Sequence, residues 1–306
     1  HREMAELWTG LRVSLGALPA NQLLFKSTAV VTSVADSGPG TLRAAASNSL
    51  NAAIITFAPG LSGQTIVLTN GQIELSNSVI ANNRAKWDGG GIEIVESEVS
   101  IHSSELHANT VQGGAGGAIF ISDQATVTVE GNRIRENSSE GWSAGGIFVA
   151  GGAQTEIIAN EILSNTVPDN AGGGIRIADE GTYALIRGNI IRGNSAKGGG
   201  GINVSEKATA EISENEISEN QASEWDGPGI SVGQGADARI LDNTFTGNFM
   251  SSGSDYGSAA IQILGSSTAT VDGNTITNNG HIHPDSGTNQ ACLSIYYNEE
   301  PVVFSN

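Results

Sequence analysis

Several common residue types are scarce in this chain, and each scarcity narrows the range of functions that the protein can have. One cysteine in 306 residues excludes a disulfide within the chain, although it does not settle the cellular compartment. Only 14 residues are lysine or arginine, against 32 aspartates and glutamates, so the net charge is −18. A nucleic-acid binder needs a basic surface that is missing here, and anionic membranes or polyanionic substrates would be repelled. No run of 18 apolar residues is present, so no transmembrane helix is predicted.

Proline is also rare, with 7 residues, whereas glycine is abundant, with 41. The glycines keep a fixed phase, because a glycine-rich phrase that ends in isoleucine recurs at steps of 27, 28, 28, 27, 28 and 31 residues. The register isoleucines are Ile92, Ile119, Ile147, Ile175, Ile202, Ile230 and Ile261. A repeat of this length cannot bury its apolar face alone, so neighbouring repeats must stack. The sequence therefore predicts one elongated solenoid domain.

A second motif recurs with the same period as the glycine-rich one. It consists of asparagine, any residue, a large apolar residue, two further residues and asparagine. Its members are Asn132-Ile134-Asn137, Asn160-Ile162-Asn165, Asn189-Ile191-Asn194, Asn215-Ile217-Asn220, Asn243-Phe245-Asn248 and Asn274-Ile276-Asn279, with Ser104-Leu106-Asn109 as a weaker member and Asn77-Val79-Asn82 as the predicted start. We expect these asparagines at turn corners, where their amides bond to each other and to the backbone of the next coil.

Each repeat holds three short apolar bursts with period-two alternation, as at 175–177, 184–186 and 189–191. A strand that pairs with its own equivalent one repeat later is parallel and in register. The prediction is an all-β, right-handed, single-stranded parallel β-helix with three short strands per coil and about eight coils. The expected inward pairs in the first strand are Ile92/Ile94, Ile119/Ile121, Ile147/Val149, Ile175/Ile177, Ile202/Val204, Ile230/Val232 and Ile261/Ile263.

The residues before the repeats are predicted to form a cap. Residues 1–28 are interpreted as a capping segment, a precursor segment or an artificial extension, with an amphipathic helix carrying Leu7, Leu11 and Leu15 as the favoured form. Residues 29–75 are predicted to be the N-terminal cap, with a strand at 29–34, a short helix at 40–53 and the first incomplete coil at 65–68 and 73–75. The repeats then occupy residues 76–306.

Two parts of the sequence resemble known families. The stretch Val31 to Arg43, followed by Ile54 to Gly60, resembles the N-terminal cap of large secreted bacterial β-helix proteins. The alternation of Gly-Gly-Ala-Ile at 116–119 with Phe-Thr-Gly-Asn at 245–248 resembles polymorphic outer-membrane proteins and autotransporter-like adhesin passengers. This resemblance covers about residues 31–279 and implies an extracellular or bacterial cell-surface protein with a pectate-lyase-like fold. It implies little about activity, because lyases, epimerases and tailspikes share this coil.

A lyase of this fold needs carboxylates for Ca²⁺ and an arginine or lysine base on one outer face. The outward residues of the first strand are instead Glu93, Phe120, Phe148, Arg176, Asn203, Ser231 and Gln262. One acid and one base, separated by two aromatic coils, form a poor catalytic column. We therefore expect no catalytic residues, no metal and no cofactor. The enzyme question stays open, with a polysaccharide lyase or epimerase acting on uronate polymers as the alternative, in which case Ca²⁺ would be needed.

A more promising column lies in the glycine turn. Trp87, Trp142, Trp225 and Tyr256 each lie five residues before a register isoleucine, and in two coils an aspartate, Asp88 or Asp226, follows at once. Exposed rings beside carboxylates suit stacking on sugar rings. Two interpretations stay open: each ring folds over its own turn as a satellite apolar cluster, or the rings form a ligand platform. Phe120 and Phe148, outward neighbours on adjacent coils, are a second candidate platform or a partner contact.

Two weaker features remain. His281 and His283 have metal-like composition but lack further ligands, so a solvated turn is favoured. Thr244, Thr246, Thr275 and Thr277 form a Thr-x-Thr ladder that is too short for an ice-binding face. The function predicted from the sequence is a structural or adhesive module that binds a polysaccharide or a surface protein. A self-assembling filament subunit, joined by end-to-end self-association, is a further alternative.

Overall fold

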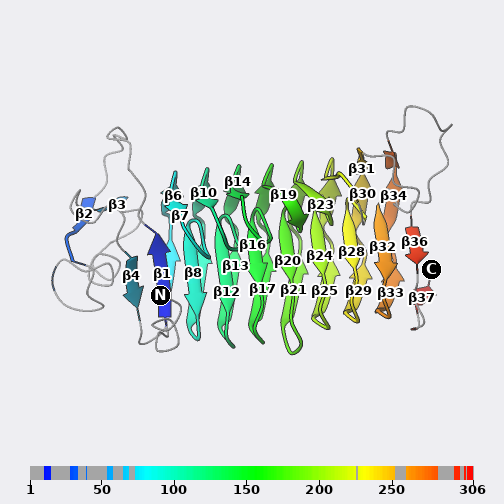
Figure 1. The fold of residues 1–306 in the computed structure, drawn as a ribbon, viewed down its shortest axis with the longest axis horizontal. Coiled ribbons are helices and arrows are strands. Elements are labelled where there is room, and N and C mark those ends of the chain that lie inside the picture. Colours follow the sequence, from blue (N-terminus) through cyan, green and yellow to red (C-terminus); the bar gives the residue numbers. More distant parts are fainter. Residues whose placement is uncertain are drawn as a thin grey trace.

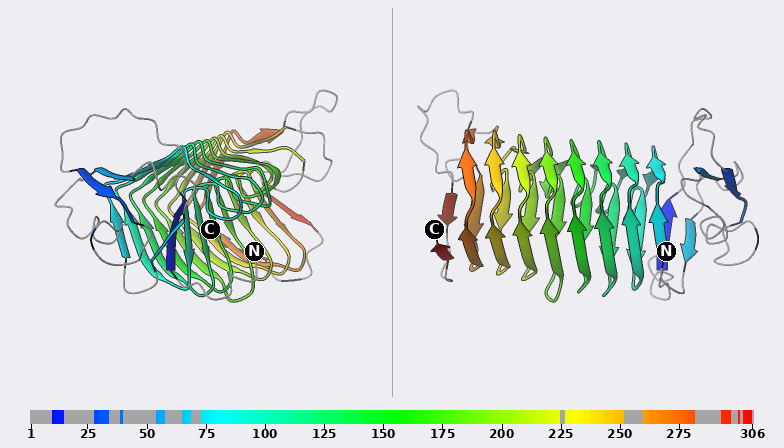
Figure 2. Two further views of the ribbon diagram at one scale, coloured as in Figure 1. Left: turned by 60° about the vertical axis from the view of Figure 1, so that its left-hand side comes forward. Right: turned by 180° about the vertical axis from the view of Figure 1, so that it is seen from behind.

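The computed structural model describes residues 73–224, 227–251 and 260–281, with shorter stretches at 10–14, 28–33, 54–57, 65–68, 293–296 and 302–305 and single residues at 39 and 300. These residues form an all-β parallel solenoid in which successive turns lie side by side along the long axis (Figure 1). Seen obliquely, the turns superpose on one another around a common interior (Figure 2). The described residues contain no helix, and therefore no helix long and apolar enough to cross a membrane.

Four sheets run along the solenoid, and each turn contributes one strand to each sheet. Sheet 1 contains β4 (Thr65–Leu68), β1 (Gly10–Ser14), β8 (Ile92–Val95), β12 (Ile119–Ser122), β16 (Ile147–Val149), β20 (Ile175–Ile177), β24 (Ile202–Val204), β28 (Ile230–Val232), β32 (Ile261–Leu264) and β36 (Leu293–Tyr296). Sheet 2 contains β5 (Ile73–Ser76), β9 (Glu98–His102), β13 (Thr126–Glu130), β17 (Gln154–Ile158), β21 (Tyr183–Arg187), β25 (Thr209–Ser213), β29 (Asp237–Leu241), β33 (Thr268–Asp272) and β37 (Val302–Ser305).

The other two sheets are built from shorter strands. Sheet 3 contains β6 (Val79–Ala81), β10 (Glu105–His107), β14 (Arg133–Arg135), β18 (Glu161–Leu163), β22 (Ile190–Arg192), β26 (Glu216–Ser218), β30 (Thr244–Thr246) and β34 (Thr275–Thr277). Sheet 4 contains β7 (Arg84–Ala85), β11 (Thr110–Val111), β15 (Ser138–Ser139), β19 (Thr166–Ala171), β23 (Ser195–Gly198), β27 (Gln221–Ala222), β31 (Phe249–Met250) and β35 (Gly280–His281). A separate parallel pair joins β2 (Thr28–Val31) to β3 (Ile54–Phe57).

The prediction of three strands per coil is therefore wrong, because a fourth strand follows the second asparagine of each phrase. That strand is often only two residues long, as in Ser138–Ser139 and Gln221–Ala222. Two residues are too few to show period-two alternation, so the sequence pattern does not distinguish this strand from a turn. About seven turns are described without a large gap: β5 to β32 make seven sets of four strands, and β33 to β36 supply the strands of a further turn, part of which lies outside the described residues.

The predicted core is confirmed. All fourteen inward residues of the first strand have no exposed surface. They stack like on like, with Ile119 beside Ile147 and Ile175 beside Ile202 in the ladder of sheet 1. Burial of branched apolar side chains in register with their own kind stabilises the stack by about 1.5–3 kcal/mol for each side chain.

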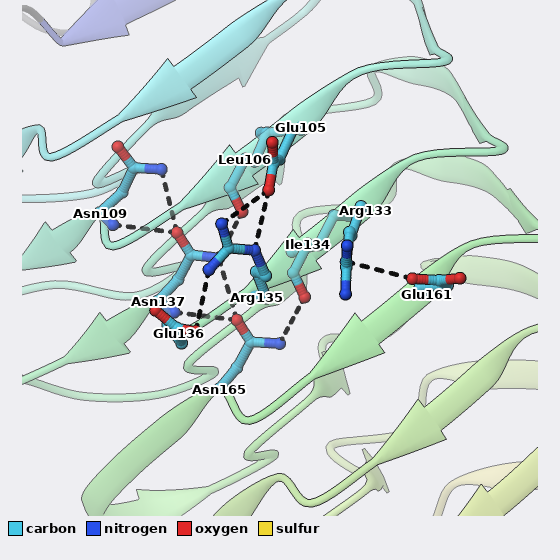
Figure 3. A network of polar contacts seen from close by, with 10 residues as sticks. All are labelled: Glu105, Leu106, Asn109, Arg133, Ile134, Arg135, Glu136, Asn137, Glu161 and Asn165. Carbon is cyan, nitrogen blue, oxygen red and sulfur yellow. Dashed lines mark hydrogen bonds and ion pairs between the residues drawn. The ribbon is translucent and has the colours of Figure 1, made fainter.

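Two asparagine ladders form the corners on either side of sheet 3. Asn137 is fully buried, and its backbone N–H and Nδ2 both donate to Oδ1 of Asn165, at 3.0 and 2.9 Å. Its Nδ2 also donates to the carbonyl oxygen of Leu106 at 2.9 Å (Figure 3). Each ladder asparagine follows a residue with positive φ, such as Glu136 at 55° or Gly193 at 65°. In each turn, the positive-φ residue makes the bend, and the asparagine that follows it makes the hydrogen bonds.

The start of the ladders differs by one residue from the prediction. Asn109 Oδ1 accepts from the backbone N–H and Nδ2 of Asn83, and Ser104 Oγ accepts from the backbone N–H of Ser78. Asn77 and Asn82 instead occupy the positive-φ positions, at 48° and 58°. The sequence Asn82-Asn83 offers two candidates for one corner, and asparagine tolerates the left-handed conformation better than most residues do.

The N-terminal segment enters the fold as a strand. Gly10–Ser14 pairs antiparallel with both β8 and β4, so Leu11 lies in a strand and the helix predicted through it is wrong. Leu7, Leu15 and the helix predicted at 40–53 lie outside the described residues. Because β1 occupies the free edge of β8, sheet 1 does not continue in parallel at this end.

Candidate functional site

Two tryptophans project from the turn that leads from sheet 4 into sheet 1. Trp87 precedes β8 and Trp142 precedes β16, and the two residues are 61% and 69% exposed. Bare indoles leave a large apolar surface in water, which is unfavourable unless a partner covers it. If each ring folded over its own turn as a satellite cluster, the rings would be mostly covered. The observed exposure favours the platform interpretation instead.

Glycines form the turn surface beside the first indole. A Cβ atom at Gly113 would lie 3.1 Å from Cζ3 of Trp87, and one at Gly114 would meet the Asp88 carboxylate. A Cβ atom at Gly141, one turn further on, would meet the backbone of Gly113 and Gly114. The Trp87 ring therefore leans onto the following turn, where no side chain stands in its way. The glycines at 113, 114 and 141 are therefore explained by close packing between turns.

Asp88 has a structural contact. Its Oδ1 accepts a hydrogen bond from the backbone N–H of Ala115 at 2.9 Å, which ties the first turn to the second. The ammonium of Lys86 lies 5.2 Å from the centroid of the Trp87 ring, within the range of a cation–π contact. These two contacts fix the position of the turn that carries the indole.

The other charged side chains of this turn column are also engaged. Arg84 and Glu140 form an ion pair at 2.8 Å across two turns, close to Trp142 in the sequence. Lys197 occupies the tryptophan position of a later turn and lies 3.2 Å from Glu224 and 3.5 Å from Asp169. The hydrogen bond to Glu224, more than any other contact, raises the pKa of Lys197. Within the described turns, the column is aromatic at 87 and 142 and charged at 197.

Several predicted residues lie outside the part of the chain that the structure describes. These are Trp225, Asp226 and Tyr256 of the turn column, and His283. His281 belongs to β35, where only the backbone is described. Among the described residues, no three His, Cys, Asp or Glu side chains gather as metal ligands would. The described part of the column therefore consists of Trp87, Asp88 and Trp142.

The outer face of sheet 1 carries the second aromatic group. Phe120 and Phe148 are neighbours in the ladder, and their rings stack with centroids 5.4 Å apart and planes at 18°. Both residues are half-buried. One turn further on, Arg176 Nη1 donates to Oδ1 of Asn170 at 3.2 Å, and Asn170 occupies the tryptophan position of its turn. The turn column and the outer column of sheet 1 therefore adjoin.

Arg176 is held in place by several contacts. Its Nη2 lies 2.6 Å from Oε1 of Glu206, its Nη1 donates to Ser143 Oγ at 2.9 Å, and its side chain is only 13% exposed. A guanidinium fixed in this way has no free face from which to act as a base. The predicted outward residues beyond it, Asn203, Ser231 and Gln262, are buried rather than solvated. Arg176, the basic residue that the sequence placed in this outward column, is therefore engaged in the structure.

Comparison with protein families agrees with this architecture. Residues 54–162 and 140–306 match the family model described as a right-handed beta helix region. The chain belongs to the right-handed β-helix family. No curated protein and no solved structure matched it. The β-helix part of the resemblance drawn from the sequence is thereby confirmed, and so is the predicted right-handedness of the solenoid.

Sheet 3 of the β-helix carries two shallow grooves that sequence reasoning missed. The first crosses β6, β10, β14 and β18, and its floor includes the ion pair of Arg133 with Glu161 at 3.2 Å. Arg135, on the same strand, lies 2.8 Å from Glu105, and this hydrogen bond raises its pKa (Figure 3). Alternating glutamate and arginine at the outward positions of the asparagine phrase was the available signal. Exposed pairs of this kind contribute about 0–1 kcal/mol each.

The second groove lies over β26 and β30 and is lined mainly by Glu214, Glu216, Glu219 and Asp242, with Arg192 at its side. Arg192 pairs with Glu219 at 2.7 Å. The Thr-x-Thr ladder forms its border, since Thr246 and Thr277 have their Oγ1 atoms 3.2 Å apart. Neither groove holds an exposed aromatic residue, so the two tryptophans remain the strongest candidate site.

Proposed function

We propose that this β-helix is a non-catalytic carbohydrate-binding module of a protein located outside the cell or on a bacterial cell surface. The observation that carries the proposal is the pair of exposed indoles, Trp87 and Trp142, on one column of a rigid scaffold. Flat aromatic rings stack on the apolar faces of sugar rings. The resemblance of the repeats to adhesin passengers supports the location.

The rest of the molecule supports a binding role. Parallel ladders run through all four sheets, and the corners are fixed by fully bonded amides, so the scaffold keeps the indoles in place. A preorganised site loses little conformational freedom when a ligand binds. The stacked Phe120 and Phe148 adjoin the same column and extend the apolar surface toward sheet 1.

A retention experiment tests this function. The chain is incubated with a panel of insoluble polysaccharides, and the bound fraction is measured for the unmodified chain, for Trp87→Ala/Trp142→Ala and for Ile190→Ala. Ile190 is a matched control because it is an exposed apolar residue on sheet 3, away from the column. We expect binding that only the double tryptophan variant loses. Equal retention of all three chains, or release of unsaturated products from a uronate polymer, would contradict the proposal.

A further inference from the structure

The spacing of the two indoles restricts the carbohydrate that fits them. Trp87 and Trp142 stand on the first and third turns, as the register of sheet 1 from β8 through β12 to β16 shows. Neighbouring parallel strands are about 4.8 Å apart, so two turns place the backbone positions of the two tryptophans about 10 Å from each other along the axis. The turn between them contributes Gly113 and Gly114, which have no side chains of their own and lie beneath the Trp87 ring and the Asp88 carboxylate.

A polymer that uses both rings must present the same face at each of them. In an extended β-1,4-linked glycan, successive sugars are turned over, so every second sugar shows the same face. Such a chain is also straight and flat over this length. An α-1,4-linked glucan coils, and its faces turn away from a straight row of rings. The interval of about two strand spacings therefore fits alternate sugars of an extended β-linked chain.

The charges around the platform decide between neutral and anionic chains. Asp88 and Glu140 flank the indoles and are matched in number by Arg84 and Lys86, so the negative field at the platform comes from the protein as a whole, whose net charge is −18. The cations nearest in sequence already have partners, since Arg84 pairs with Glu140 and Lys86 lies over the Trp87 ring. A uronate or sulfated chain would lie in a negative field without a dedicated cation. The surroundings favour an uncharged polymer.

We infer, resting on the proposed carbohydrate-binding function, that the ligand is a neutral, extended β-1,4-linked polysaccharide lying parallel to the solenoid axis. Trp87 and Trp142 stack on two sugars of the chain separated by one sugar. The intermediate sugar lies above the glycine turn and contacts only backbone and the edge of Trp87. Binding then requires at least three consecutive sugars for both rings to be used.

A length series of oligosaccharides tests this inference by calorimetry. Neutral β-1,4-linked glucose oligomers of two to six units are compared with α-1,4-linked glucose oligomers of equal length and with oligogalacturonates. We expect a rise in affinity of about tenfold between two and three or four units, in the β-linked series only. Trp142→Ala should abolish that rise and leave the weak binding of the shortest oligomers, whereas Ile190→Ala should change neither.

The outcomes separate this inference from the function on which it rests. Tryptophan-dependent binding of the α-linked or uronate series in preference to the β-linked series would overturn the inference and leave a carbohydrate-binding module. A β-linked series with no rise in affinity at any length, or a rise that survives Trp142→Ala, would likewise overturn it. No binding of any soluble or insoluble glycan by the folded chain would overturn both proposals.

Discussion

The asparagine corners and the glycine turns are the two kinds of bend in this solenoid, and they differ in how much they vary. In the corners, six successive turns repeat the same pair of asparagines with the same hydrogen bonds, from Asn132 and Asn137 to Asn274 and Asn279. In the glycine turns, one position holds tryptophan, glycine, tryptophan, asparagine and lysine in succession, at 87, 114, 142, 170 and 197.

This difference indicates at which positions the sequence can be substituted without unfolding the molecule. A corner asparagine satisfies buried backbone groups in the preceding turn and donates to the asparagine side chain of the following turn, so its replacement affects three turns. A side chain on the glycine turn points away from the core, so it can change with little effect on stability. Stability and binding are therefore expected to belong to different bends of the same repeat, and the predictions below test that separation.

The largest effect is expected in the core that both bends enclose. Ile175→Asp places a carboxylate where no surface is exposed and should cost roughly 4 kcal/mol or more, because the charge has no partner there. The same substitution at the exposed Ile190 should cost less than about 1 kcal/mol. Denaturant unfolding of both variants measures the difference, and equal midpoints would show that the register of the coil is wrong.

The next effect is expected at the corners. Asn194→Ala leaves the backbone N–H of Asn165 and the carbonyl oxygen of Ile162 without their side-chain partners, and should cost about 1–3 kcal/mol. Gln112→Ala, at an exposed position, is the control and should be neutral within about 0.5 kcal/mol. Thermal unfolding monitored by circular dichroism is the measurement. A neutral result for Asn194→Ala would mean that water replaces the ladder bonds.

A smaller effect is expected on the face between the corners. Arg135→Gln removes ion pairs with Glu105 and Glu136, both at 2.8 Å, and should cost at most about 1 kcal/mol, with the loss shrinking as salt is added. The raised pKa of Arg135 implies stability that is present at neutral pH and lost only in strong alkali, as the pH rises through the folded-state pKa. Its contribution should therefore be constant across the neutral pH range. A strong pH dependence of this difference would contradict the assignment.

Much of the fold was predictable because the same pattern of apolar residues and asparagines recurs in successive turns. Period-two alternation placed Ile175 and Ile177 in the core, and the spacing of the asparagines placed the corners. The fourth strand was not predictable, since Ser138–Ser139 is short and polar and its pairing depends on the turns above and below. The start of the ladder was displaced by one residue because Asn82 and Asn83 are chemically the same and only the φ angle separates them.

The candidate site was less predictable than the fold. The column of Trp87 and Trp142 followed from counting back from the register isoleucines, but exposure depends on the neighbouring turn, where Gly113 leaves room for one ring. Alternation also placed Asn203 and Ser231 outward, and yet both are buried. Whether an outward side chain is exposed depends on which other segments pack over that face, and the alternation within a strand does not predict this.

The smallest effect on stability and the largest on binding are expected together, in Trp87→Ala/Trp142→Ala. The most direct test compares this variant with Asn194→Ala in one experiment, in which retention on an insoluble polysaccharide that the unmodified chain binds is measured well below the unfolding midpoints. The account predicts that the tryptophan variant loses retention while its midpoint stays unchanged, and that Asn194→Ala keeps retention while its midpoint falls. A tryptophan variant that unfolds earlier and still binds would contradict it.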